Sequence, residues 1–456
     1  MAIISFNPAT NKIIKKHYVH TELKIKKNLK SSLKSQKYWS SLTLEERLAP
    51  VLQMSSYLKD NYLELSKMIT QEMGKPIKQS ILEVRKCADL CDYYYKSSPK
   101  ILSDIKYKIK GQKTFITYQP LGLILGIMPW NFPFWQVFRF AIPSLIVGNG
   151  AILKHSSNVQ GCAKLIEESF KITEFPRNIF KNIIVPGSKV SKIIKNPDIA
   201  AVSLTGSNQA GISVATTAAS VLKKTVLELG GSDPYIILSD ADLIESAEAC
   251  IDGRILNAGQ SCISAKRIIV INTVYDKFLE ILNNKLLNKK IGDPMTDVDL
   301  GPMVSKSARD EIHEQVLESV KRGAKLLMGG YFPEKLGSYY PLTLLGDVKP
   351  GMPAFDDELF GPVFSIIKAN NDKNAIDLAN SSEFGLGASI FTKDIKKGED
   401  IAKTKIFSGS CFVNDFVKSD PRLPFGGIKK SGYGRELASQ GMLEFVNIKT
   451  IVIKNN

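Results

Sequence analysis

The chain has 456 residues, 44% of them hydrophobic and 23% charged, which is ordinary for a globular protein and too long for one typical domain. Its formal net charge of +16 comes from lysines scattered along the chain, so we expect no nucleic-acid partner. The six cysteines form no CxxC pair and the four histidines are far apart, so neither a disulfide framework nor a metal site is predicted.

The N-terminal segment predicts a cytoplasmic protein, because MAIISFNPATNK has no basic leader followed by a long apolar run. Residues 114–138 carry no charge, but three prolines and an asparagine interrupt them. We therefore interpret this stretch as buried core, and we expect no membrane span.

Two helices are predicted before this stretch. The first long helix is expected to begin at Thr43, where TLEE forms a capping box with Glu46 and apolar residues follow at helical spacing. Gly74 and Pro76 interrupt the pattern, and a second helix is expected from Ile77 onward.

Residues 106–119 alternate polar and apolar side chains around Gly111, which predicts a two-stranded ribbon. The C-terminal segment FVNIKTIVIK reads as a further strand. Because such strands expose unpaired backbone edges, we expect them to join subunits into a homodimer or a homotetramer.

Between these segments, short apolar runs alternate with stretches of helix length, as in LILGIM, AILK, NIIV, AAVSL and TVLEL. This rhythm predicts an α/β fold with a parallel sheet. It restarts after Gly230 with YIIL and RIIVI, which indicates a second α/β unit.

Three segments carry residues suited to catalysis. Cys262 follows Gly259, which permits a tight bend, although an isolated cysteine is more often a packing thiol. Glu228 ends an apolar strand, where ligands bind in α/β sheets, and two glycines near it allow close approach. Asn131 lies between two prolines in PWNFPFW, so its amide is held as a candidate oxyanion donor.

Together with NPAT near the start, LTGS, DELFGPV and PFGGIKKSGYGRE, these segments resemble the aldehyde dehydrogenase superfamily over nearly the whole chain. Within it, EMGKPI, MPWNFPFWQVFR and KKSGYGRE are most similar to bacterial succinate-semialdehyde dehydrogenases. The resemblance implies two Rossmann-like parallel-sheet domains and a small β oligomerisation unit. We expect a dinucleotide-binding domain at 1–105 with 120–229, a catalytic domain at 230–430, and the oligomerisation unit at 106–119 with 431–456.

The resemblance also implies a mechanism. The Cys262 thiolate would attack the aldehyde carbon, and Asn131 with the Cys262 amide would hold the oxyanion. After hydride transfer to a nicotinamide, Glu228 would act as general base for water that hydrolyses the thioester.

For the cofactor, LTGSNQAG suits a pyrophosphate at a helix N-terminus. The family pattern places further cofactor contacts at Gly206, Ser207, Trp130, Leu229, Glu358 and Phe360. Lys154 would contact the adenosine ribose. Ser157 adds no negative charge there, so NADP is expected to be tolerated or preferred, and NAD stays open.

For the substrate, Arg139 could bind a distal carboxylate. Many related enzymes carry a second arginine where this chain has Leu256, and we expect Ser419 and Arg422 to compensate. The predicted substrate is succinate semialdehyde. Glutarate semialdehyde or an aliphatic aldehyde is the alternative, and a catalytically silent binding protein is the alternative from another class.

Overall fold

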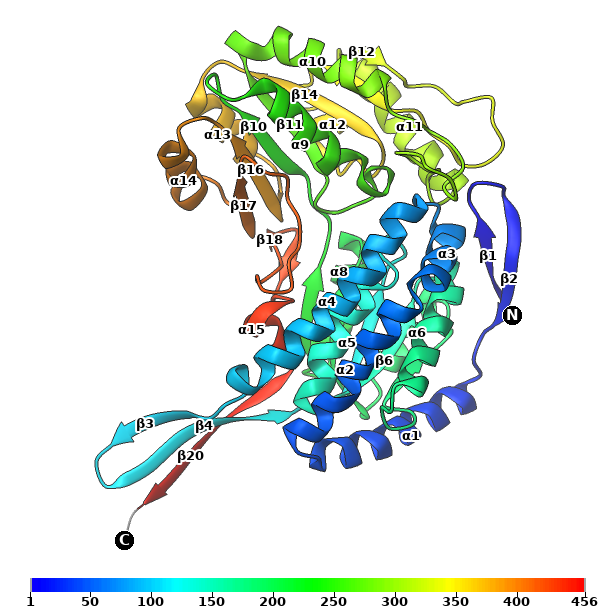
Figure 1. The fold of residues 1–456 in the computed structure, drawn as a ribbon, viewed down its shortest axis with the longest axis vertical. Coiled ribbons are helices and arrows are strands. Elements are labelled where there is room, and N and C mark those ends of the chain that lie inside the picture. The colour runs from blue at the N-terminus through cyan, green and yellow to red at the C-terminus, as the bar shows by residue number, and fades with distance from the viewer. Residues whose placement is uncertain (1, 455–456) are drawn as a thin grey trace.

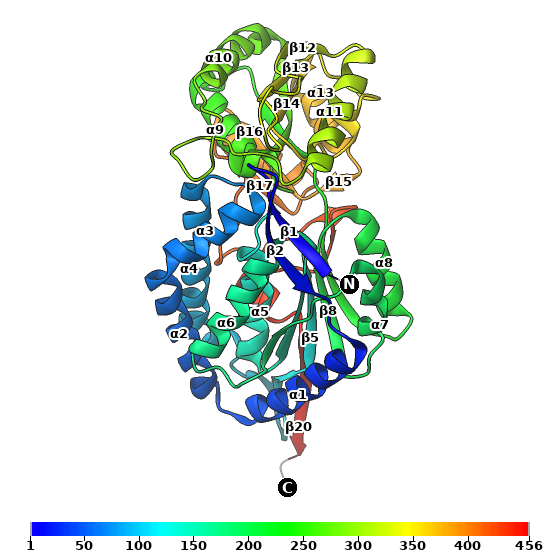
Figure 2. The same cartoon turned by 90° about the vertical axis from the view of Figure 1, so that its right-hand side faces the viewer.

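The computed structural model describes residues 2–454, which form two α/β lobes and a projecting β arm (Figure 1). A hairpin of β1 (Ala2–Asn7) and β2 (Lys12–Tyr18) starts the chain and lies along the outside of the first lobe (Figure 2). It packs on helix α3 (Tyr62–Met73) and on the short turn η1 (Ser157–Val159). The predicted α/β class is thereby confirmed.

The first lobe is built on a six-stranded sheet in the order β19-β9-β8-β5-β6-β7. All neighbours are parallel except β19, which runs antiparallel to β9. The strands are β5 (Leu123–Met128), β6 (Gly150–His155), β7 (Phe180–Asn182), β8 (Ile199–Thr205), β9 (Lys224–Glu228) and β19 (Gly432–Tyr433). The predicted run NIIV forms a strand only at its first residue, since β7 ends at Asn182.

Helices cover both faces of this sheet and share its apolar core. One face carries α2 (Leu44–Asp60), α3 (Tyr62–Met73), α4 (Ile77–Ile101), α5 (Trp135–Val147) and α6 (Gln160–Ile172). The other face carries α1 (Glu22–Ser41), α7 (Val190–Ile194) and α8 (Asn208–Ala219).

The predicted start of the first long helix was wrong, because the 20-residue helix α1 precedes it. Lysine and serine fill much of α1 and few of its residues are buried, so its apolar periodicity is weak. Thr43 nevertheless caps α2 as predicted. Its side chain accepts from the Glu46 amide, and the Glu46 carboxylate accepts from the Thr43 amide.

The second lobe is built on a seven-stranded sheet in the order β12-β13-β14-β11-β10-β16-β17, parallel except for β12. Its strands are β10 (Asp233–Ile237), β11 (Ala265–Ile271), β12 (Lys325–Met328), β13 (Thr343–Gly346), β14 (Val363–Ala369), β16 (Gly387–Phe391) and β17 (Ser410–Val413). Its helices are α9 (Leu243–Ile255), α10 (Tyr275–Leu287), α11 (Lys306–Lys321), α12 (Pro353–Asp356), α13 (Asp372–Asn380) and α14 (Ile395–Thr404). Short strands β15 (Phe384–Gly385) and β18 (Ile428–Lys429) pair beside the sheet.

The arm contains β3 (Ile105–Ile109), β4 (Gln112–Pro120) and β20 (Val446–Lys454). The predicted ribbon turns at Gly111, whose φ of +75° favours glycine. The predicted C-terminal strand pairs with β4 of the same chain over nine residue pairs, from Val446 with Pro120 to Lys454 with Gln112. The arm includes only part of the predicted segment 431–456. Within that segment, β19 joins the first sheet and α15 (Ala438–Met442) packs on α5.

Glu83 of α4 forms a buried ion pair with Lys75, just before this helix, and accepts hydrogen bonds from the start of α5. Lys75 Nζ lies 2.5 Å from Glu83 Oε2, and both side chains are almost completely buried. The other Glu83 oxygen accepts the backbone amides of Phe134 and Trp135, at 2.9 and 3.0 Å. Glu83 therefore fixes the turn that carries PWNFPFW after β5.

Two features are absent from residues 2–454. No helix there is both long and apolar enough to cross a bilayer. No group of three or more histidine, cysteine or carboxylate side chains there could hold a metal ion.

We predict that Glu83→Ala lowers the free energy of unfolding by about 3–5 kcal/mol, because it leaves Lys75 buried without its partner. Urea unfolding followed by circular dichroism would measure the change. Glu64→Ala is the matched control, since Glu64 is exposed on α3. Equal stability of the two variants would contradict this role of Glu83.

Candidate active site

The predicted catalytic residues follow strands whose carboxyl ends face the second lobe. Asn131 follows β5, Gly206 and Ser207 follow β8, and Glu228 is the last residue of β9. Carboxyl ends of parallel strands meet at one edge of a sheet, which is where α/β folds bind ligands. The tertiary structure brings Cys262 to this edge from the other lobe, where it follows α9 in the chain.

The loop before Cys262 is a turn of unusual backbone conformation. Asn257, Ala258 and Gly259 have φ values of 58°, 53° and 73°. A Cβ atom on Gly259 would lie 2.2 Å from the carbonyl oxygen of Gly361, so only glycine fits. The bend that the sequence predicted at Gly259 is therefore confirmed.

Hydrogen bonds hold Asn131 against this loop. Its side-chain amide donates to the Gln260 carbonyl at 3.1 Å, and its side-chain oxygen accepts from Gln136 at 3.0 Å. Asn257 donates to the carbonyls of both Asn131 and Gln260. Because a side-chain amide has two N–H groups, one remains to donate to a bound oxyanion.

Cys262 lines two different cavities. One, of about 520 Å³, is a cleft between the lobes, and the other, of about 210 Å³, lies toward α4 and α5. Cys262 is therefore accessible from two cavities. Of the residues predicted from the sequence, the cleft also contains Trp130, Asn131, Gly206, Ser207, Leu229, Glu358 and Phe360.

The electrostatic surroundings of Cys262 disfavour its ionised form. Burial raises the pKa of the Cys262 thiol to about 12, and the positive charge of Lys266 opposes this effect. Lys266 itself donates to the carbonyls of Ser261 and Cys262 at 2.7 Å. It lies 3.3 Å from Glu358, so it connects the nucleophile's loop to the cleft.

Glu228 is buried behind the cleft and lines neither cavity. Its two carboxylate oxygens lack a hydrogen-bond partner among residues 2–454. Burial and the nearby Glu436 raise the pKa of Glu228 well above its usual range, although Arg139 and Arg435 oppose this. The surroundings of Glu228 in this position therefore disfavour its ionised form.

The cleft has the features of a dinucleotide site. Trp130 and Phe360 form its walls, with their rings edge to face and 5.8 Å apart. Ser207 caps α8 by accepting from the Ala210 amide, so the positive end of a 12-residue helix points into the cleft. A Cβ on Gly230 would meet Glu358 at 2.5 Å, so the glycine lets that carboxylate enter the site.

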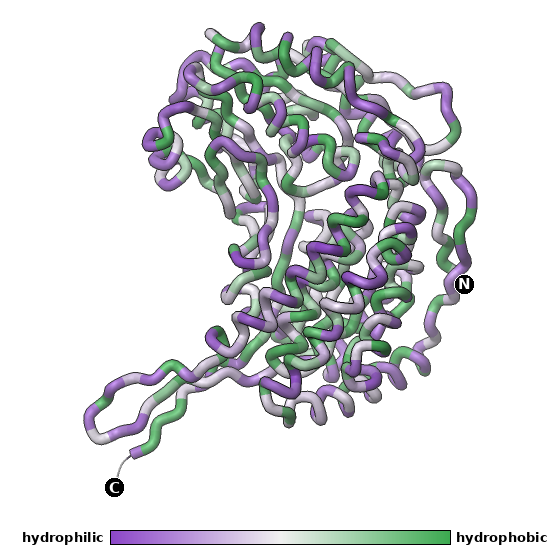
Figure 3. Tube along the Cα trace, in the orientation of Figure 1, coloured by the Kyte–Doolittle hydropathy of each residue, from purple (hydrophilic) through white to green (hydrophobic). Residues whose placement is uncertain are grey.

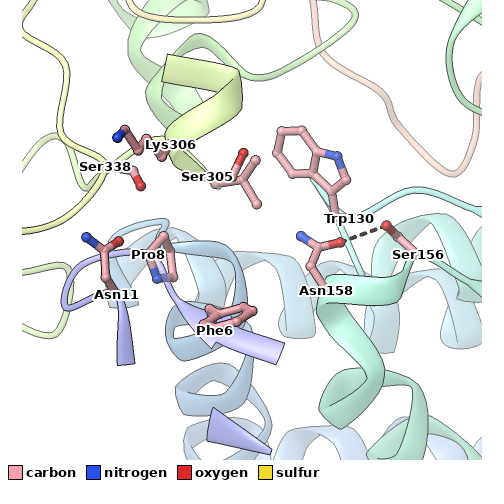
Figure 4. A pocket seen from close by; sticks show the side chains of 10 residues that line it. Phe6, Pro8, Asn11, Trp130, Ser156, Asn158, Ser305, Lys306 and Ser338 are labelled. Carbon is pink, nitrogen blue, oxygen red and sulfur yellow. Dashed lines mark hydrogen bonds between the residues drawn. The ribbon is translucent and has the colours of Figure 1, made fainter. Parts of the chain in front are cut away.

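Lys154 and Ser157 lie outside the lining of this cleft. Lys154 is in β6 beside Ile127 of β5, and burial lowers its pKa. Ser157 is exposed at the start of η1. Its neighbours line a third cavity, of about 550 Å³, which shares Trp130 with the cleft (Figure 4). Ser156 donates a hydrogen bond to the side-chain oxygen of Asn158 at 2.7 Å. Figure 4 shows this pair beside the Trp130 ring.

The three residues that were predicted to bind the substrate lie differently relative to the small cavity. Arg139 lines it, but its guanidinium is buried in an ion pair with Glu436 and lies 4.7 Å from the Phe425 ring. Ser419 also lines it. Arg422 does not, because its exposed side chain pairs with Asp420 at 2.7 Å.

Sequence reasoning missed Lys86, Gln136 and Glu436 at this site. Gln136 lies between Asn131 and the small cavity, and Lys86 projects from α4 into that cavity. The only sequence signal for Lys86 was its position. It lies two residues after Val84, outside the apolar stripe of the predicted helix. Glu436 lies 297 positions from Arg139, and no local pattern links residues so far apart.

The sequence of this chain is similar to proteins of one known family. Residues 1–451 match the model of the aldehyde dehydrogenase family. A probable succinate-semialdehyde dehydrogenase [NADP(+)] of Synechocystis is 42% identical, over 99% of this chain and 100% of that protein. A succinate semialdehyde dehydrogenase [NAD(P)+] of Escherichia coli is also 42% identical, over 98% of this chain and 97% of that one.

The fold comparison gives the same result. The crystal structure of succinic semialdehyde dehydrogenase from Streptococcus pyogenes, in complex with NADP+, covers 100% of both chains, with a TM-score of 0.97 and 35% identity. The resemblance predicted from the motifs is thus confirmed over the whole length. This chain, with its cysteine loop facing a dinucleotide cleft, belongs to the aldehyde dehydrogenase family.

Proposed function

We propose that this protein oxidises succinate semialdehyde to succinate with NADP or NAD. The observation that carries the proposal is the position of Cys262, which lines both the cleft and the small cavity. A substrate in one cavity and a nicotinamide in the other would meet at its thiol. Two full-length relatives are named as dehydrogenases of this aldehyde, and these names support the choice of substrate.

The chain's residues have distinct roles in this proposal. Cys262 forms a bond to the aldehyde carbon, and the free N–H of Asn131, together with the Cys262 amide, stabilises the oxyanion. The bound cofactor supplies a hydride acceptor. Glu228 then takes a proton from the water that hydrolyses the thioester on Cys262 and releases the acid.

The cofactor's phosphates would lie at the N-terminus of α8, held by Gly206 and Ser207. Trp130, Leu229 and Phe360 would enclose the chain of the cofactor, and Glu358 would accept from the nicotinamide ribose. Lys154 is in no ion pair among residues 2–454 that would compete for its charge, so it suits the adenosine end. Ser157, three positions further along the chain, would add no negative charge near the 2′-phosphate of NADP.

We also propose that the arm joins subunits into a dimer or a tetramer. The arm extends away from the body, and apolar segments continue along it (Figure 3). Exposed apolar side chains cover it, including Ile105, Tyr107, Ile448 and Val452, at 44–58% exposure. Burying such a surface would stabilise an assembly, and light scattering would give its mass. The cytoplasmic location stays a prediction, which cell fractionation would test.

We predict that the purified protein reduces NADP or NAD fastest with succinate semialdehyde, compared with glutarate semialdehyde and propionaldehyde. Cys262→Ala should abolish turnover, because no other thiol lines either cavity among the described residues. Absorbance at the reduced nicotinamide band measures the rate. Equal rates with propionaldehyde would indicate an aliphatic aldehyde as substrate, and no reduction with any aldehyde would indicate a binding protein.

We predict that kcat rises as the pH is raised from neutral into the alkaline range, because burial raises the pKa of both Glu228 and Cys262 and so favours their protonated forms. Glu228→Gln should lower steady-state kcat by roughly 10²- to 10⁴-fold while keeping a burst of reduced cofactor. Stopped-flow absorbance separates the two phases. A variant that loses burst and steady state alike would place Glu228 before hydrolysis.

We predict that Ser157→Glu lowers kcat/KM for NADP relative to NAD by roughly tenfold or more, because a carboxylate there repels the 2′-phosphate. Ser157→Ala is the control, since it removes the hydroxyl without adding charge. Initial rates with each cofactor at saturating aldehyde give the ratio. An unchanged ratio in Ser157→Glu would show that the adenosine ribose binds elsewhere.

A further inference from the structure

Lys266 is a buried cation that holds the loop of the nucleophile. It lies in β11, and only 1% of its side chain is exposed. Its Nζ donates to the carbonyl oxygens of Ser261 and Cys262, each at 2.7 Å, and it lies 3.3 Å from Glu358 Oε1. An ammonium group has three N–H donors, so these three oxygens satisfy it. Lys266 therefore fixes the direction of two consecutive carbonyl groups of the loop.

The first of these carbonyl groups belongs to the peptide unit that carries the Cys262 amide. In a trans peptide unit the C=O of one residue and the N–H of the next lie in one conjugated plane and point in opposite directions. A cation bound to the Ser261 oxygen therefore sets the direction of the Cys262 N–H. It also makes this N–H a stronger donor, because consecutive hydrogen bonds polarise one another. Among residues 2–454 the Cys262 N–H has no hydrogen-bond partner, so it is available to a ligand.

Glu358 supplies the counter-charge for Lys266 from the side of the cofactor cleft. Its Oε1 also accepts the Gly231 amide, at 3.1 Å, and Glu358 lines the cleft. A Cβ on Gly231 would lie 2.6 Å from the Cys262 carbonyl oxygen, so this glycine lets the cysteine loop come close. A buried ammonium group is stable only with such partners. Glu358 therefore keeps the lysine charged beside the loop.

We propose that Lys266 is a positioning residue, which orients and polarises the Cys262 amide for the oxyanion while Glu358 holds the lysine in place. This inference rests on the proposed oxidation. In that reaction the Cys262 sulfur bonds to the aldehyde carbon, and the electron pair of the carbonyl π bond moves to the oxygen that the amide binds. Asn131 remains the other donor to this oxygen.

The test compares two reactions of the same thiol, both with bound cofactor and at one pH. Attack on an aldehyde creates an oxyanion, whereas alkylation by iodoacetamide displaces iodide from a saturated carbon and creates none. Both reactions need the Cys262 thiolate, so the ionisation of the thiol cancels in the ratio of their second-order rate constants. Stopped-flow absorbance gives the burst of reduced cofactor at low aldehyde concentration, and peptide mass spectrometry follows alkylation at Cys262 alone.

Lys266→Met removes the ammonium group and keeps most of the side-chain volume. We expect the ratio of the burst constant to the alkylation constant to fall roughly 10- to 100-fold, since loss of a whole oxyanion donor costs about 10²- to 10³-fold. The KM for the cofactor should change little, because Glu358 keeps its bond to the Gly231 amide. Lys266→Gln retains two N–H donors, so it should lower the ratio by less, and it replaces Lys266→Met if that variant does not fold.

Lys368→Met is the matched control, because Lys368 is exposed on the neighbouring strand β14. It should leave the ratio unchanged. If a folded Lys266 variant keeps the wild-type ratio, or changes only the KM for the cofactor, Lys266 serves the fold or Glu358 and the inference fails while the proposed oxidation stands. If the wild type shows no burst with any aldehyde, the proposed oxidation fails and the inference fails with it.

Discussion

The buried ion pair between Lys75 and Glu83 is the constraint on which the site depends. One Glu83 oxygen neutralises Lys75, and the other accepts hydrogen bonds from the amides of Phe134 and Trp135 at the start of α5. This fixes α4, the turn that carries Asn131, and α5 relative to one another. The oxyanion donor and the wall of the small cavity therefore keep their positions without a ligand, and a preorganised donor is what stabilises a developing charge.

The second requirement is contact between the lobes. Asn131 belongs to the first lobe, and Gln260 and Cys262 belong to the second, yet hydrogen bonds between backbone carbonyls and side-chain amides join them directly. The strained turn at Asn257–Gly259 is tolerated because these bonds hold it. The nucleophile is thus placed by both lobes, whereas the cleft for the cofactor opens between them.

Charge is distributed unequally around the nucleophile. Toward the cleft, Lys266 is balanced by Glu358, and behind it Arg139 is balanced by Glu436. Toward α4, Lys86 donates a hydrogen bond to Ser419.

The sequence by itself determined the α/β class, the alternating strands, the capping box at Thr43, the ribbon around Gly111 and the family, because these depend on local periodicity and contiguous motifs. It failed at α1, whose apolar stripe is weak, and it could not foresee that Glu436 neutralises Arg139. Only the tertiary structure decided which cations keep a partner. Ion pairs form between side chains that the fold brings together from distant parts of the chain, and their separation in sequence leaves no local pattern.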